Sequence, residues 1–162
     1  MGHRASAIDL GQRRVYAEDS TSGKKYSEPF DHLLIASGAV PIRPNIPGID
    51  AQGIHELSTL QSGIQVRQAV DRKSPKRVVI VGAGYIGLEM AENFILRGLE
   101  VTIVEKMPQV MNTLDPDMGM LIAEVLKNKG VKLFLEESVK AFEADGGEVR
   151  AVVTETKRFP AD

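Results

Sequence analysis

The sequence predicts an α/β fold in which a doubly wound parallel sheet carries an antiparallel β appendage. Two largely apolar runs, 77–81 and 101–104, are rich in β-branched residues, as is typical of parallel strands covered on both faces. Between them, residues 86–97 place their apolar side chains at helical spacing. Strand and helix therefore alternate, and this alternation predicts the parallel sheet.

The segment before the first parallel strand predicts β structure, then a connector, then one helix. Short strands are expected at 5–10 and 15–17, and a further apolar β run at 33–36. Residues 39–53 contain three prolines and two glycines, a density that excludes a regular helix or a central strand. A helix is expected over 57–70.

After the second parallel strand the alternation continues. Pro116 can open a helix with Asp115 as its N-cap, and Gly130 can close it. A third strand follows at 131–135.

The last part of the sequence predicts a β-hairpin. Two apolar runs, 139–142 and 149–153, flank the turn signal Gly146-Gly147. This hairpin is the expected antiparallel appendage. No closing strand is expected in residues 159–162.

Composition excludes several classes of function. The chain has 162 residues and a formal net charge of −2, so it offers no basic surface for nucleic acid. It has no cysteine, which excludes disulfides, thiolate metal ligands and a cysteine nucleophile. Its three histidines show no ligand spacing, so we expect no metal site. It lacks a secretory signal and the apolar run of about 18 residues that a membrane span requires, so we expect a cytoplasmic protein.

A six-residue motif joins the first parallel strand to the helix behind it. Its pattern, G-x-G-x-x-G between a strand and a helix, is typical of a dinucleotide-binding, Rossmann-like unit. The first glycine permits a tight turn, the second lets the backbone approach a pyrophosphate, and the third lets the helix pack on the strand. Free N–H groups at the helix start suit a diphosphate. The candidate cofactor-binding residues are Gly82, Ala83, Gly84, Tyr85, Ile86 and Gly87.

An acidic residue completes the pattern. Glu105 ends the second parallel strand, 18 residues after Gly87. A carboxylate there accepts hydrogen bonds from the adenosine ribose and repels a 2′-phosphate. Arginine, the usual partner of that phosphate, is absent between residues 98 and 149, and only Lys106 lies nearby. The sequence therefore predicts NAD(H) rather than NADP(H), with Glu105 and Lys106 as candidate cofactor-binding residues.

Three stretches resemble the FAD-dependent pyridine nucleotide–disulfide oxidoreductases. The first is FDHLLIASGAVP, at 30–41, which is similar to the signature where the chain leaves the FAD domain. The second, RVVIVGAGYIGLE at 77–89, looks most like the branch of NADH oxidases, NADH peroxidases and coenzyme A–disulfide reductases. The third is LDPDMGMLIAEVLKNKGVKLF, at 114–134. The resemblance as a whole extends over essentially the entire chain.

The resemblance implies roles for individual residues. Tyr85 would stack over the flavin and move aside as nicotinamide arrives, and Glu89 would lie near the nicotinamide end. Ala36, Ser37 and Gly38 would touch FAD through their backbone. The alternatives are an ordinary amphipathic side chain at Tyr85 and a solvated helix charge at Glu89.

The resemblance also implies a domain organisation. Residues 1–40 would be a remnant of the FAD-binding domain, 41–75 a Pro/Gly-rich connector and helix, and 76–162 a truncated NAD(H)-binding Rossmann domain. The family's FAD fingerprint, its redox cysteine and the strand expected after Asp162 are not in the sequence, so we expect the sheet to lack its last strand. The parent would pass hydride from NADH to FAD and on to a disulfide, peroxide or oxygen. This chain alone would bind cofactor and carry no catalytic residue.

Two other functions stay open at this point. One is the NAD domain of a ferredoxin or rubredoxin reductase, and the other is a non-catalytic NAD(H)-sensing module. We also expect an exposed edge on the strand at 78–81, which is a liability that usually finds a partner. Pairing of this edge with residues 33–36 or with a second copy, giving a homo-oligomer, is the expected outcome.

Overall fold

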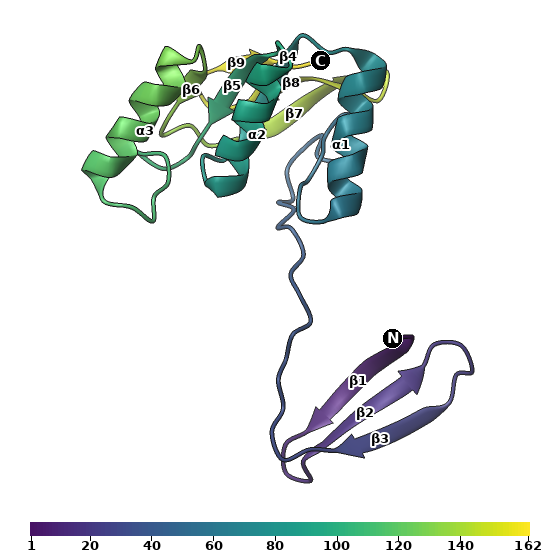
Figure 1. The fold of residues 1–162 in the computed structure, drawn as a ribbon. Helices are drawn as coiled ribbons and strands as arrows, with labels where there is room; N and C mark the ends of the chain where they lie inside the picture. Colours follow the sequence, from purple (N-terminus) through teal and green to yellow (C-terminus); the bar gives the residue numbers. More distant parts are fainter. The chain divides into compact units, whose positions relative to one another are not determined.

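The computed structural model describes residues 1–162, which form two compact units, Met1–Ala39 and Val40–Asp162 (Figure 1). The smaller unit is a three-stranded antiparallel sheet in the order β1-β2-β3. Its second turn is closed by the Asp19 carboxylate, which accepts hydrogen bonds from the backbone N–H groups of Thr21 and Ser22. The strands are β1 (His3–Asp9), β2 (Arg14–Asp19) and β3 (Lys25–Pro29).

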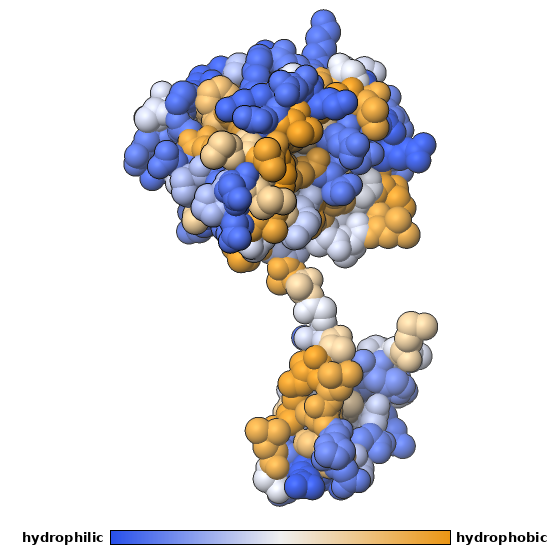
Figure 2. Space-filling view, turned by 60° about the vertical axis from the view of Figure 1, so that its left-hand side comes forward, coloured by the Kyte–Doolittle hydropathy of each residue, from blue (hydrophilic) through white to orange (hydrophobic).

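The predicted β run at 33–36 is wrong. Residues 33–40 form neither strand nor helix, and Leu34 and Ile35 are 88% and 70% exposed. A strand needs a partner for its backbone groups, and the third strand of this sheet is formed instead by the more polar segment β3. Hydrophobic side chains also reach the surface on one side of the smaller unit (Figure 2). Its exposed large hydrophobic residues include Ile8, Leu10 and Tyr16.

The larger unit contains the predicted parallel sheet, in the order β4-β5-β6. β4 pairs in parallel with β5, and β5 pairs in parallel with β6. Each crossover contains one helix, as predicted from the alternating pattern. The elements are β4 (Arg77–Val81), α2 (Tyr85–Leu96), β5 (Glu100–Val104), α3 (Pro116–Asn128) and β6 (Lys132–Phe134).

The two faces of this sheet bury different cores. Val101 and Ile103 are buried in the cluster that contains Ala91 and Phe94 of α2, whereas Val104 belongs to a second cluster. This division follows from the two-residue period of a strand, which sends alternate side chains to opposite faces. Both faces of the sheet are packed against other elements, which agrees with the apolar, β-branched composition of its strands.

An antiparallel sheet, in the order β7-β8-β9, covers the second face. Its Val152 and Phe159 pack with Val104, and the rings of Phe134 and Phe159 are 4.8 Å apart between centroids. Figure 1 shows the three helices on one side of the parallel sheet and this sheet on the other. The predicted Rossmann-like α/β fold with an antiparallel appendage is confirmed. The strands are β7 (Ala141–Asp145), β8 (Glu148–Val153) and β9 (Arg158–Pro160).

The expectation that no strand forms in 159–162 is wrong, because β9 pairs with β8. Three residues are too few to show an alternating pattern in the sequence. The proline that ends β9 also lowers the strand propensity of the segment. Burial of Phe159 against the parallel sheet is what holds β9 in place.

The connector is attached to the hairpin by its backbone. Phe142 N–H donates to Pro47 O at 2.8 Å, and Gln52 N–H donates to Gly147 O at 2.9 Å. The connector leads to α1 (Leu60–Lys73), which begins three residues later than predicted. The reason is the N-cap: Thr59 and Ser62 form a capping box that fixes the helix start.

β4 lies at the edge of the parallel sheet, as expected. Its predicted pairing with residues 33–36 is wrong, because that segment forms no strand. Only the start of β4 has a second neighbour, where Asp162 N–H donates to Arg77 O at 3.3 Å. None of the three helices combines the length and the apolar content that crossing a lipid bilayer requires.

Candidate functional site

The site is built around the turn between β4 and α2. β4 ends at Val81, and α2 begins at Tyr85 with Gly84 as its N-cap. Gly82 has a φ of 105°, a left-handed conformation that glycine adopts without strain. Its N–H donates to Val104 O at 2.9 Å, which ties the turn to the end of β5. The carboxyl ends of two adjacent parallel strands therefore meet at this turn.

The other two glycines of the motif differ in what surrounds them. A Cβ on Gly87 would lie 2.2 Å from Gly82 O, so this position is required for α2 to pack against the turn. A Cβ on Gly84 would meet no atom within 4 Å. The space above Gly84 is open, which is the space that a ligand approaching the backbone would need.

The N-terminus of α2 has no side-chain cap and no acidic residue in its first turn. This contrasts with α1, where the capping box uses the side chains of Thr59 and Ser62. The first N–H groups of a helix have no partner within the helix, and they carry partial positive charge. The start of α2 therefore presents N–H groups free to bind an anion.

Glu105 lies beside this turn, directly after β5. Its carboxylate oxygen Oε2 accepts a hydrogen bond from Ala83 N–H at 2.7 Å, and Oε1 accepts one from Met107 N–H at 2.8 Å. Each carboxylate oxygen keeps a further lone pair for another donor. Glu105, which its spacing from Gly87 predicted to act together with the glycine motif, therefore contacts that motif directly. Lys106 follows and is exposed.

The loop after Glu105 was missed by the sequence reasoning. Met111 N–H donates to Ala83 O at 2.9 Å, so both sides of Ala83 are held, one by Glu105 and one by this loop. Met111 is buried with a φ of 48°, which is unusual for a residue with a side chain. No spacing or composition signal in the sequence marks these backbone contacts.

A second acid, Glu137, lies behind the first. Its N–H donates to Glu105 O at 2.9 Å. Its carboxylate accepts hydrogen bonds from Lys157 Nζ at 2.5 Å and Thr156 Oγ1 at 2.6 Å. These bonds, that from Lys157 first, lower the pKa of Glu137 to about 2. No local pattern in the sequence predicts this role for Glu137, since its partners lie 19 and 20 residues further along the chain.

The structure brings together part of the predicted set. The motif residues 82–87 lie with Glu105 and Lys106 at the ends of β4 and β5. Tyr85, 69% exposed, is on the first turn of α2, and Glu89 is exposed one turn further on. Ala36, Ser37 and Gly38 are exposed residues of the smaller unit. These three residues therefore take no part in the contacts between the glycine motif and Glu105, which lie within the larger unit.

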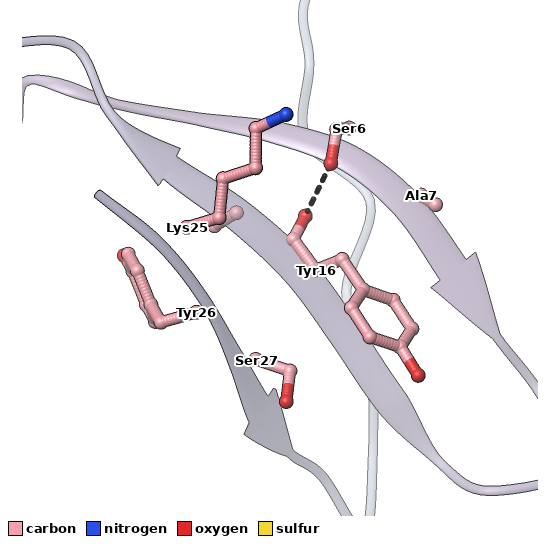
Figure 3. Close-up of a pocket in the computed structure, with 7 residues that line it drawn as sticks. Ser6, Ala7, Tyr16, Lys25, Tyr26 and Ser27 are labelled. Atoms are coloured by element: carbon pink, nitrogen blue, oxygen red, sulfur yellow. Dashed lines mark hydrogen bonds between the residues drawn. The ribbon is translucent and has the colours of Figure 1, made fainter. Parts of the chain in front are cut away.

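A hollow of about 470 Å³ lies on the smaller unit, along the β1–β3 sheet (Figure 3). Ser6 Oγ donates to Tyr16 O at 3.3 Å there. Its lining has one charged side chain, Lys25, and no carboxylate. None of the predicted site residues belongs to it, and it shows no arrangement of groups for acid–base chemistry.

Comparison with known families identifies the chain. Residues 1–162 match the family model described as pyridine nucleotide-disulphide oxidoreductase. The chain belongs to this family. The membership expected from the three resembling stretches is confirmed.

One curated relative is an NADH oxidase from Enterococcus faecalis. It is 36% identical over 165 residues, which cover 100% of this chain and 36% of the relative. The chain thus spans about a third of the length of this relative. Other relatives named NADH oxidase and NAD(P)H sulfur oxidoreductase are covered to a similar extent.

Solved structures share the fold. A water-forming NADH oxidase from Lactobacillus brevis bound to NADH is 33% identical with a TM-score of 0.83, and the match covers 99% of this chain and 35% of that one. An engineered mutant of that oxidase, described as a water-forming NADPH oxidase bound to NADPH, is 31% identical with a TM-score of 0.81 and equivalent coverage. A ferredoxin reductase from Rhodopseudomonas palustris is 28% identical with a TM-score of 0.86, covering 100% of this chain and 39% of that one.

Proposed function

We propose that the larger unit is the NAD(H)-binding domain of a flavin-dependent oxidoreductase. In the full protein this domain would present NADH to FAD, and the electrons would pass on to a disulfide, a peroxide or oxygen. The observation that carries the proposal is the hydrogen bond from Ala83 N–H to the Glu105 carboxylate, which joins a ribose-binding acid to an open glycine turn.

The residues of the site fit a dinucleotide. The diphosphate would lie over Gly84, where the backbone is uncovered, and would accept hydrogen bonds from the free N–H groups at the start of α2. Gly82 and Gly87 would keep the turn close enough for this approach. The adenosine ribose would donate to the remaining lone pairs of Glu105.

The preference for NAD(H) over NADP(H) rests on the charge of Glu105. A 2′-phosphate would bring negative charge to this carboxylate, and Lys106 is the one cation directly next to it in the sequence. The engineered NADPH-bound relative supports this reading. Its substitutions include a glycine to alanine and, 18 residues later, an aspartate to alanine followed directly by an alanine to arginine. Gly87 and Glu105 have the same spacing in this chain.

The bound nicotinamide would supply the hydride. Tyr85 and Glu89 lie on the exposed side of the first two turns of α2, where they would flank the nicotinamide end of a dinucleotide bound at the turn. Tyr85 would shield the flavin in the absence of NADH. Ala36, Ser37 and Gly38 would contact FAD through their backbone.

A second candidate function is the same domain in a ferredoxin reductase. The observation that favours it is the TM-score of 0.86 with the Rhodopseudomonas palustris enzyme. In that case the electrons would pass to a protein partner in place of a disulfide, peroxide or oxygen.

Calorimetric titration of this chain with NADH and NADPH tests the proposal. We expect NADH to bind more tightly than NADPH. Glu105→Ala should bring the dissociation constants of the two nucleotides closer together, because the charge that repels the 2′-phosphate is gone. Glu92→Ala, an exposed acid of α2, is the matched control and should leave the gap unchanged. Failure of the unsubstituted chain to bind either nucleotide would contradict the proposal.

A further inference from the structure

The backbone of residues 105–107 is held from behind by the turn that follows β6. Glu137 N–H donates to Glu105 O at 2.9 Å, and Glu136 N–H donates to Met107 O at 3.1 Å. Met107 N–H in turn donates to the Glu105 carboxylate. The position of this carboxylate therefore depends on where the 136–137 turn lies.

The 136–137 turn is fixed by the β8–β9 turn. The Glu137 carboxylate accepts from Thr156 Oγ1 and Lys157 Nζ, and its side chain is 9% exposed. Thr154 Oγ1 accepts from Lys157 N–H at 3.0 Å, so this turn is closed by its own hydrogen bonds. Lys157 Nζ also lies 5.6 Å from the centroid of the Phe134 ring. A continuous path of hydrogen bonds thus runs from Lys157 to Ala83 in the glycine turn.

This ion pair differs from the others in the molecule. Glu137 is the one buried charged residue, whereas both partners of each other ion pair are at least 31% exposed. Only the carboxylate of this pair is buried, since the Lys157 side chain is 46% exposed. A partly solvated ion pair adds little net stability, because water screens the attraction between its charges. Its directional hydrogen bonds are a better explanation of its presence than stability is.

We propose that Glu137 is a positioning residue for NAD(H) binding. Held by Thr156 and Lys157, it fixes the backbone at Glu105 and so orients the carboxylate that accepts from the glycine turn and from the ribose. The inference rests on the proposed function. It adds a residue to the nucleotide site that has no contact with the nucleotide.

A purely structural role for Glu137 predicts a different result. Loss of a structural ion pair would lower stability and weaken NADH and NADPH binding by the same factor. Loss of a positioning residue affects the interactions of Glu105 in particular. It would therefore change the ratio of the NADH and NADPH affinities. It would also speed hydrogen exchange at the backbone amides of Ala83 and Met107, which donate to the Glu105 carboxylate.

The experiment compares four variants of the full chain. Glu137→Gln removes the charge at nearly constant shape, Lys157→Ala removes the cation, and Lys157→Arg restores it. The matched control is Glu143→Gln, which breaks an exposed ion pair with Arg158 on the same antiparallel sheet. Amide hydrogen exchange is measured without nucleotide, and the dissociation constants of NADH and NADPH are measured by calorimetry.

We expect Glu137→Gln and Lys157→Ala to speed exchange at Ala83 and Met107, and to raise the NADH dissociation constant by about threefold to tenfold. The NADPH constant should change less, and Lys157→Arg should restore most of the NADH affinity. Glu143→Gln should resemble the unsubstituted chain. Unchanged exchange at Ala83, or an unchanged NADH to NADPH ratio, would overturn the inference. The proposed function fails separately, if the unsubstituted chain binds no nucleotide.

Discussion

Three glycines within six residues serve three different physical purposes. Gly82 takes a left-handed conformation, Gly84 leaves open space above the backbone, and Gly87 lies against Gly82 O too closely for any side chain. The sequence motif predicts all three purposes, but only coordinates separate the glycine needed for folding from the glycine that leaves room for a ligand.

This difference gives a prediction for two alanine variants. Gly84→Ala should change the free energy of unfolding by no more than about 1 kcal/mol, since its Cβ meets nothing. It should nevertheless raise the NADH dissociation constant at least about tenfold, because the methyl group occupies the space of the diphosphate.

Gly87→Ala, in contrast, should lose more stability than Gly84→Ala. Its Cβ would force the turn to move, at a cost of roughly 2 kcal/mol in unfolding free energy. The engineered NADPH-bound relative includes a glycine-to-alanine exchange at the matching spacing, so we expect the variant to fold with a displaced turn. Urea unfolding and calorimetry distinguish the two variants, and equal losses of stability would contradict the assignment.

At the scale of the elements, prediction succeeded where the local pattern and the burial agreed. β4, α2 and β5 lie within a residue or two of their predicted bounds, because both faces of the strands and one face of the helix are buried. Residues 33–36 are as apolar but form no strand, and the short β9 forms without any such signal. Hydrophobicity alone does not provide a strand with a partner.

The connector shows how tightly a loop can be specified. Gly48 has a φ of 79°, and a Cβ there would lie 1.9 Å from Phe142 O. Gly130 has a similar φ of 84° but open space around its Cβ position. The two glycines therefore share the conformational penalty of alanine and differ in the clash.

We expect Gly130→Ala to cost about 1 kcal/mol of unfolding free energy, and Gly48→Ala about 3 kcal/mol, because the connector must leave β7. Chemical denaturation of both variants measures the difference. If the two costs were equal, the clash at Phe142 would have no energetic weight.

At the scale of the whole molecule, the two units are unequal. Both hydrophobic clusters lie in Val40–Asp162, whereas the smaller unit is an antiparallel sheet with no cluster of buried side chains of its own. Small sheets without a covered face are marginally stable in water. The nucleotide site and the stability of the chain should therefore reside in the larger unit.

A chain of residues 40–162 should fold and bind NADH with an affinity within about twofold of the full chain, as measured by calorimetry and thermal unfolding. An unfolded product would show that the smaller unit is required.

Light scattering on the same samples tests the predicted homo-oligomer through the edge of β4. A monomer at all concentrations would contradict that prediction.

The sequence by itself determined the βαβ unit, the glycine motif, the paired acid and the family, because these depend on periodicity and spacing over short stretches of chain. Only the tertiary structure decided how the acid is held. Ala83 and Glu137 contact Glu105, and Lys157 contacts Glu137, through hydrogen bonds between segments far apart in the chain. Such contacts leave no local pattern, because either partner alone looks like an ordinary polar residue or an ordinary peptide group until folding brings the two together.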